Sequence, residues 1–504
     1  MPELISTLTG KINRRSPRTV SSNKEVWYRQ NMVSRDGRLK KVAGTEPAID
    51  TGLTDVCTWL GRYVSYETGV MSPKTFAYTI DGKLWNISET NRTATEIKTG
   101  FNLKAYPESR ILKYGNQNYM YFIDGVSLFK YDGNNSNVFT TVPISHIGTR
   151  LVSLIEHRDR LLVLGDRSLR ESKNLDFDVF DDATDSIEII VGSGKGTCLA
   201  LRKIEERLYI LTTEGVYILD GDTISAVAET FSISLVEERN IISARTAIKV
   251  ENSIMFLAGE DENIELWSFD GGNSKLLSYS EKITEFINPY KEQLDKAVAI
   301  YEDHYYKLSF VQTGATYNNF EVWYDAIEDK IDFVVGRNVS CYMTADTTAE
   351  INYSLIGRSD KNTICYANRG INFSGNPIEL KLTSKDIILN KGDRARVDDI
   401  FVLFEPSGER SVFIRYLLDG RLSDISNTAQ FYQDLSGDAA TLGFIRINNQ
   451  SQAMERIKPR IDYSCGISMA LELYDNNIDT ECSILGIGFN ITNKGKIKSK
   501  KVGA

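Results

Sequence analysis

Hydrophobic and polar residues alternate with a period of two through much of the chain, and tight turns bound the alternating runs. The clearest runs are Lys83–Ile87, Val126–Tyr131, Gly215–Leu219 and Ile264–Phe269, with a variant at Phe320–Asp325. An Asp-Gly pair precedes the first run and follows the next three. Alternation next to an Asp-Gly turn predicts antiparallel β-hairpins.

Each run recurs after 45 to 55 residues, except that the gap between Asp132 and Asp220 is nearly double. A degenerate unit, Arg160–Asp166, lies in that gap. Counting it gives six units between about Thr54 and Gly336. Four strands per unit at this spacing predict a β-propeller of about six blades, with five or seven blades as alternatives. An irregular β-solenoid or stacked sandwiches remain the other interpretation.

The pattern changes outside this region. We expect residues 1–53 to form an extended basic N-terminal arm and residues 337–376 to form a connector with short strands. About seven further strands follow Pro377, which predicts a C-terminal β-sandwich at residues 377–492 and leaves a basic tail at 493–504. The predicted fold class is therefore all-β: a propeller with a C-terminal sandwich and an N-terminal arm.

The charge of the chain is unevenly distributed. The net charge is −9 overall, but the first 41 residues carry +7 and the last eleven carry +5, so the rest carries −21. An acidic body repels nucleic acid over most of its surface. Basic ends can meet phosphate or an acidic partner, or remain solvated. The candidate interaction residues are Arg14, Arg15, Arg18, Lys40 and Lys41.

Composition excludes several classes of protein. No run of 18 apolar residues exists, so we expect no membrane insertion, and the first ten residues do not resemble a secretory signal. The six cysteines form no CxxC pair and only three histidines are present, so zinc-site spacing is absent. We expect reduced cysteines and no metal or cofactor.

Candidate catalytic patterns fail in their context. Gly192–Thr197 resembles a phosphate-binding loop, but Gly196 separates the lysine from the threonine and a strand is predicted to follow. The acidic stretch 176–185 lacks the glycine turn and final glutamate of a calcium loop. No histidine accompanies a Gly-x-Ser-x-Gly motif. The Ser-x-Asp-x-Gly-x-Thr-Trp repeat of propeller glycosidases is missing. The chain is therefore predicted not to be an enzyme.

Three segments resemble one known family. They are a basic, Gly-rich opening at 10–45, the pair His157–Val163 and Ser172–Phe177, and the closing strands Glu455–Ile461 and Ile467–Leu473. All are similar to the packaged-DNA stabilisation, or tail nozzle, proteins of short-tailed bacteriophages. The likeness spans nearly the whole chain with diffuse motifs, and it transfers no functional residue.

The resemblance implies a structural subunit of a virion tail, assembled in the host cytoplasm. It implies a homo-oligomer, a hexameric ring below the portal and adaptor proteins. Such a ring extends the DNA channel, retains the packaged genome and seats fibres, spikes or a needle. The acidic body fits a channel in which duplex DNA makes weak contacts. The alternative is a carbohydrate-binding or carbohydrate-cleaving propeller of a phage or bacterium.

Overall fold

The regular secondary structure in the computed structural model is almost entirely β-strand. It describes residues 4–6, 26–35, 38–65, 72–388, 395–404 and, from 413 to 493, the strands given below. Short gaps lie at 104, 115–116, 134–138, 146–147, 182–185, 187, 195, 222–223, 226–227, 230–231, 261–262, 278–282 and 346–352. None of the helices within this described part is long and apolar enough to span a membrane. The chain divides into two compact units: unit 1 (residues 1–45, 328–336 and 368–504) and unit 2 (residues 46–327 and 337–367).

Within the described residues, unit 2 contains seven small groups of three or four strands that follow one another along the chain, numbered here sheet 1 to sheet 7, and the two-stranded pair β21–β22 (Ile224–Ser225, Ala228–Glu229). Sheets 1 to 3 are β6–β9 (Cys57–Ser65, Ser72–Thr79, Lys83–Ser88, Thr93–Lys98), β10–β13 (Glu108–Tyr114, Gln117–Ile123, Leu128–Tyr131, Thr140–Val142) and β14–β17 (Leu151–His157, Arg160–Gly165, Ser168–Glu171, Glu188–Ile190). Sheet 4 is β18, β19, β20 and β23 (Cys198–Ile204, Arg207–Thr212, Val216–Asp220, Ser232–Glu237), and sheet 5 is β24–β27 (Ile248–Val250, Ser253–Glu260, Asn263–Phe269, Ser274–Leu276). Sheet 6 contains β28–β30 (Val298–Glu302, Tyr305–Phe310, Phe320–Asp325), and sheet 7 contains β32–β34 (Val339–Ala345, Tyr353–Arg358, Ile364–Ala367) with β5 (Thr45–Pro47) on its outer edge.

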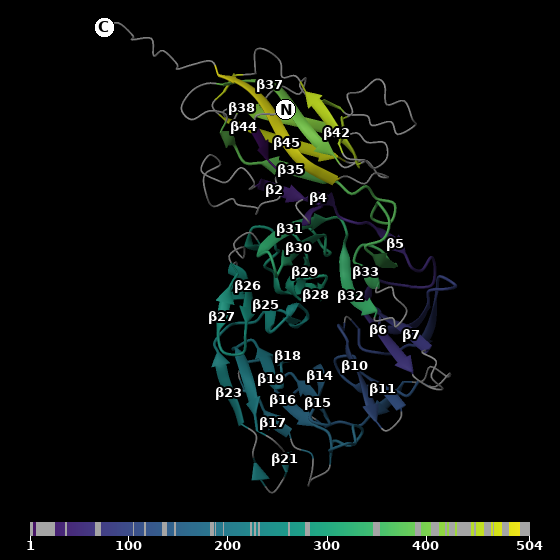
Figure 1. The fold of residues 1–504 in the computed structure, drawn as a ribbon. Coiled ribbons are helices and arrows are strands. Elements are labelled where there is room, and N and C mark those ends of the chain that lie inside the picture. The colour runs from purple at the N-terminus through teal and green to yellow at the C-terminus, as the bar shows by residue number, and fades with distance from the viewer. Residues whose placement is uncertain are drawn as a thin grey trace. The chain divides into compact units, whose positions relative to one another are not determined.

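These seven sheets form a closed ring. The first strand of each sheet contacts the first strand of the next, in the order β6, β10, β14, β18, β24, β28 and β32, and β32 returns to contact β6 (Figure 1). The first strands therefore lie innermost, and the later strands of each sheet lead outward.

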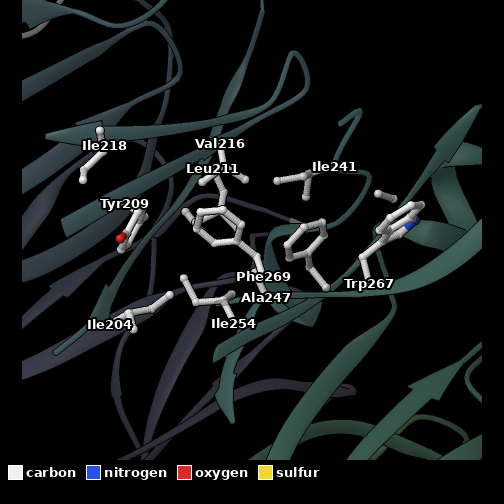
Figure 2. Close-up of a cluster of buried hydrophobic side chains, with 13 residues drawn as sticks. Ile204, Tyr209, Leu211, Val216, Ile218, Ile241, Ala247, Ile254, Trp267 and Phe269 are labelled. Atoms are coloured by element: carbon white, nitrogen blue, oxygen red, sulfur yellow. The ribbon is translucent and has the colours of Figure 1, made fainter. Parts of the chain in front are cut away.

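Apolar packing between neighbouring sheets holds the ring together. Figure 2 shows one such cluster, in which Tyr209 and Leu211 of sheet 4 pack with Ile254, Trp267 and Phe269 of sheet 5. Equivalent clusters join sheets 1 and 2, 2 and 3, and 3 and 4. A two-sided sheet of three or four strands cannot bury both faces alone, so each sheet depends on its two neighbours.

The alternating runs of the sequence are the third strands of their sheets. They correspond to β8, β12, β20, β26 and β30. At Asp270, the carboxylate accepts hydrogen bonds from the backbone N–H groups of Gly272 (3.0 Å) and Asn273 (2.8 Å), which forms the turn between β26 and β27. The Asp-Gly pair here therefore marks the end of a strand, where the aspartate carboxylate accepts hydrogen bonds from backbone N–H groups of the following turn.

Sheet 7 differs from the sequence expectation. Residues 337–376 were expected to be a connector, but β32–β34 in this stretch complete the ring. Its third strand, β34, is short and has neither the aromatic alternation nor the Asp-Gly turn. Chain from the beginning of unit 2 joins it instead: the Ala48 N–H donates to the Ile364 carbonyl at 2.8 Å. A sheet completed from far along the sequence leaves no local repeat to detect.

Unit 1 contains two sheets assembled from distant segments. One sheet includes β1 (Leu4–Ser6), β3 (Met32–Arg35), β4 (Arg38–Lys41), β37 (Ala395–Phe404), β41 (Ile445–Ile447), β42 (Gln450–Ile457), β43 (Cys465–Gly466) and β45 (Ser483–Asn493). The other includes β2 (Val26–Gln30), β31 (Lys330–Val335), β35 (Leu380–Ser384), β36 (Ile387–Ile388), β38 (Phe413–Leu418), β39 (Arg421–Leu422), β40 (Ala429–Gln430) and β44 (Ser468–Asp475). Buried side chains at alternate positions, such as Leu471 and Leu473 of β44, give the sheets apolar faces.

Up to residue 45, the described part of the expected N-terminal arm is built into unit 1, and its last residues, 46–53, belong to unit 2. β2 pairs with β35 and β31, and β4 pairs with β45. Arg29 is fully buried and donates from Nε to Asp332 Oδ1 at 2.6 Å. Lys41 is buried 3.3 Å from Asp475. The cations therefore have carboxylate partners about 300 and 430 positions away, which sequence periodicity cannot reveal. The unit boundaries at residues 45 and 367 accordingly differ from those expected at 53 and 376.

Replacing Arg29 tests the role of the buried ion pair. Arg29→Ala leaves the Asp332 carboxylate buried without its cation, so we expect the free energy of unfolding of unit 1 to fall by about 3–5 kcal/mol. Lys40→Ala, an exposed position on β4, is the matched control and should change it by less than about 0.5 kcal/mol. Hydrogen exchange resolved to peptides of β2 and β35 measures both. Equal effects of the two variants would contradict the assignment.

Candidate functional site

Four polar side chains on or just before the inner strands of unit 2 connect several sheets of the ring. We define the axial cluster as Tyr106, Glu108, Arg202 and Arg245. Tyr106 and Glu108 lie at the start of sheet 2, and Arg202 lies on β18 of sheet 4. Arg245 lies in the 3-10 turn Ala244–Thr246 (η2), immediately before sheet 5. No pattern in the sequence had pointed to these four residues.

Arg245 bridges several sheets through its guanidinium. It donates to the carbonyl of Thr58 in β6 (3.3 Å), to that of Ser340 in β32, and to that of Lys296 just before β28 (3.5 Å). Its guanidinium carbon lies 4.4 Å from the centre of the Tyr106 ring. One side chain thus contacts the beginnings of sheets 1, 2, 6 and 7.

No carboxylate among the described residues lies within ion-pair distance of Arg245. Burial lowers the pKa of its guanidinium, although the neighbouring Tyr106 opposes this change. Carbonyl oxygens and the face of an aromatic ring replace a counter-ion. Inner strand ends of a ring expose carbonyl groups that have no ladder partner, and arginine, with five donors, satisfies several of them at once.

Arg202 makes a second bridge. Its Nε donates to the Ala247 carbonyl at 2.5 Å, and one terminal nitrogen donates to Glu108 Oε1 at 3.2 Å. Glu108 also accepts from Arg110 at 2.7 Å. Arg202 therefore links sheets 2, 4 and 5, and its side chain is only 14% exposed. The two arginines of the axial cluster thus join sheets through hydrogen bonds to carbonyl groups and to Glu108. The four residues of the cluster include no nucleophile paired with a base.

The interaction residues predicted from the sequence are not brought together in the described structure. Arg14, Arg15 and Arg18 lie outside the described residues. Lys40 is exposed on β4, where it is free to meet a partner, whereas its neighbour Lys41 is buried against Asp475. Lys41 therefore stabilises the interior of unit 1 through this ion pair.

The Gly192–Thr197 loop leads into strand β18, as its sequence context predicted. Ser193 Oγ donates to Glu214 Oε1 at 2.7 Å, and the Thr197 N–H donates to Thr213 Oγ1 at 3.0 Å. A carboxylate beside the loop repels phosphate. The loop is therefore a connection between sheets 3 and 4.

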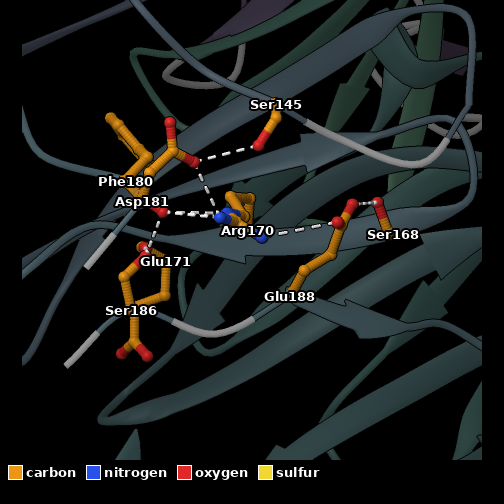
Figure 3. A network of polar contacts seen from close by, with 8 residues as sticks. All are labelled: Ser145, Ser168, Arg170, Glu171, Phe180, Asp181, Ser186 and Glu188. Atoms are coloured by element: carbon orange, nitrogen blue, oxygen red, sulfur yellow. Dashed lines mark hydrogen bonds and ion pairs between the residues drawn. The ribbon is translucent and has the colours of Figure 1, made fainter. Parts of the chain in front are cut away.

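The described members of the acidic stretch have partners within the protein. Asp178 forms an ion pair with Lys130 and accepts a hydrogen bond from Tyr121 at 2.8 Å. Figure 3 shows Asp181 receiving hydrogen bonds from Ser145 (2.9 Å) and Arg170 (2.9 Å). No cluster of three metal-ligating side chains occurs among the described residues. These carboxylates tie the loop after β16 to sheets 2 and 3.

The mid-chain segment that carried the family resemblance is a set of residues in mutual contact. Arg160 donates to the Ser172 carbonyl at 3.0 Å, and Ser172 Oγ accepts from the Leu161 N–H at 2.9 Å. Phe177 packs into the cluster between sheets 2 and 3. His157, at the end of β14, is buried, and burial together with the charges of Lys203 and Arg158 lowers its pKa to about 4. The described contacts of this segment therefore stabilise the interior of unit 2.

Comparison with known proteins identifies no family. No protein-family model matches the chain. No curated protein matches it either. Among solved structures, the chain is similar to the computationally designed Ika8 protein, with a TM-score of 0.36 and 11% sequence identity, over 64% of this chain and 99% of that one.

Replacing Arg245 tests the bridge at the centre of the ring. Arg245→Met keeps most of the side-chain volume but removes the donors to three carbonyl groups. We expect a loss of about 3 kcal/mol in the free energy of unfolding of unit 2. Arg150→Met, at an exposed arginine, should change it by less than about 0.5 kcal/mol. Urea unfolding monitored by the fluorescence of Trp59, Trp85, Trp267 and Trp323, all in unit 2, compares the two variants. A stable Arg245→Met protein would refute the bridging role.

Proposed function

We propose that this protein is a structural subunit of a bacteriophage tail, a nozzle or stabilisation ring that lies below the portal and adaptor. The finer fold belongs to the same proposal: unit 2 is a β-propeller of seven blades rather than six, and unit 1 is a β-sandwich. The ring would extend the DNA channel, retain the packaged genome and seat fibres, spikes or a needle. We place it in the virion, after assembly in the host cytoplasm.

The observation that carries the proposal is the position of the segments that resemble the tail nozzle family. The opening segment and the closing segment lie at opposite ends of the sequence, yet their described strands belong to one unit. β2 pairs with β35, which pairs with β44, and β4 pairs with β45, which pairs with β37. The two likenesses therefore concern a single folded body, which makes a chance similarity of two separate stretches less plausible.

The closed ring of sheets in unit 2 supports a structural role in a particle. A closed ring of sheets protects its strand edges, and its first and last sheets contact each other through β6 and β32. Such a body withstands load without unravelling from one end. A subunit that holds a pressurised genome needs this property more than it needs a flexible binding cleft.

Assembly of purified protein tests the proposal. We expect light scattering after size exclusion to give six times the mass of one chain, and negative-stain images to show closed rings. Replacing Arg14, Arg15 and Arg18 with Gln should abolish the rings while leaving the unfolding midpoint unchanged, because charge pairing with an acidic neighbour is lost. The matched control replaces Lys494, Lys496 and Lys498, in the other basic end. A monomer at high concentration, or rings unaffected by the arginine changes, would contradict the proposal.

Contact with DNA is a separate prediction. Residues 42–493 carry a net charge of −21, which opposes the neutralisation of many phosphates, so we expect no binding of duplex DNA tighter than about 10⁻⁶ M at physiological salt. Weak contacts would let a genome slide. Filter binding across a salt series measures this. Sub-micromolar affinity with a steep salt dependence would show instead that the arginine-rich N-terminus clamps DNA.

A further inference from the structure

Two cysteines meet where the ring of unit 2 closes. Cys57 begins β6, the inner strand of sheet 1, and Cys341 lies in β32, the inner strand of sheet 7. Their Sγ atoms are 3.7 Å apart, although 284 positions separate them in the sequence. Both side chains are buried.

Backbone geometry makes room for this pair. A Cβ atom added at Gly357, on the neighbouring strand β33, would lie 2.7 Å from Cys341 Sγ and 3.1 Å from Cys57 Cβ. Any side chain at position 357 would therefore push into the two thiols. Ser340 Oγ donates to the Cys57 carbonyl at 2.5 Å and so holds the two strands together beside the sulfur atoms.

The electrostatic surroundings differ for the two thiols. Burial raises the pKa of Cys57, and its hydrogen bond with Cys341 raises it further. Burial acts on Cys341 in the same direction, but the hydrogen bond with Cys57, the Arg245 charge and the Gly357 N–H outweigh it and lower its pKa. Cys198 offers a contrast, because burial raises its pKa to about 12. Cys341 is therefore the better nucleophile of the pair.

We propose that Cys57 and Cys341 are an oxidation site at which a peroxide converts the seam between sheets 1 and 7 into a covalent closure of the ring. The inference is independent of the proposed function. A disulfide requires the sulfur atoms to approach from 3.7 Å to about 2.05 Å.

The chemistry proceeds in two steps. The Cys341 thiolate attacks one oxygen of hydrogen peroxide, the O–O bond breaks, and the hydroxide that leaves takes up a proton to form water, so that Cys341 becomes a sulfenic acid. The Cys57 sulfur then attacks the Cys341 sulfur, the S–O bond breaks, and the hydroxide that leaves takes up the Cys57 proton to form a second water. Two thiols lose two electrons in total, and one peroxide is reduced to two waters.

The consequence is a ring that can no longer open at its seam. Without the disulfide, sheets 1 and 7 are joined by hydrogen bonds and by the apolar cluster that contains Ala48, Cys57, Leu60, Cys341 and Leu355. A cross-link across 284 positions restricts the unfolded chain strongly, because the loop that it closes is long.

Peptide mapping after oxidation tests the site. The folded full-length protein is treated with hydrogen peroxide, its remaining thiols are alkylated, and it is digested without reductant. We expect one linked peptide pair containing Cys57 and Cys341, and an unfolding temperature about 5 °C higher, reversible by reductant. Cys57→Ser and Cys341→Ser should each abolish the linked pair and the shift, whereas Cys198→Ala should retain both.

The wild-type map decides the question even if a serine variant folds poorly. Separately alkylated Cys57 and Cys341 after peroxide treatment of the folded protein would overturn the proposal. Appearance of the linked pair only in denaturant would overturn it as well, because it would show that the native seam does not permit the bond. A linked pair with no change in unfolding temperature would refute the closure of the ring.

Discussion

The sheets of unit 2 are too small to bury their apolar faces except against one another, and everything else in this unit depends on that constraint. Each interface between sheets contributes only if both sheets are held in place, so the last interface, between β32 and β6, stabilises all the others. At this interface the structure places an apolar cluster, the Ser340 hydrogen bond and the Cys57–Cys341 pair. The half-buried Arg245 adds donors to carbonyls on both sides of it.

Arg245 also offsets an unfavourable consequence of the ring geometry, namely backbone carbonyl groups of the inner strands that have no partner in a sheet. Inner strands converge and leave carbonyl groups that point toward the axis without partners, and burial of such groups is unfavourable. A guanidinium satisfies them but is itself costly to bury without a counter-ion. The face of Tyr106 and three carbonyl oxygens offset that cost, so the same contacts solve both problems.

Strands marked by local alternation and turns were predictable from the sequence, whereas contacts between residues far apart in the chain were not. Several third strands alternate and end in an Asp-Gly turn, as in β26, and were recognised. Inner strands such as β18 break the alternation, since Arg202 is directed toward other sheets rather than to solvent. The axial cluster was missed for the same reason: an isolated arginine in an apolar strand is a signal only when its long-range partners are known. The basic opening looked like an arm because Asp332 and Asp475 lie hundreds of positions away.

Long-range closure is common to both units and constrains how the chain reaches its native state. Unit 1 contains residues 1–45 and residues up to 504, and unit 2 pairs Ala48 with Ile364. Neither unit can complete its sheets until most of the chain has been synthesised, and contacts of such high sequence separation form slowly. Local hairpins such as β25–β26 can form early, but their apolar faces stay uncovered until neighbouring sheets arrive. The closing contacts in each unit are therefore both the last to form and the ones that protect all earlier structure from opening.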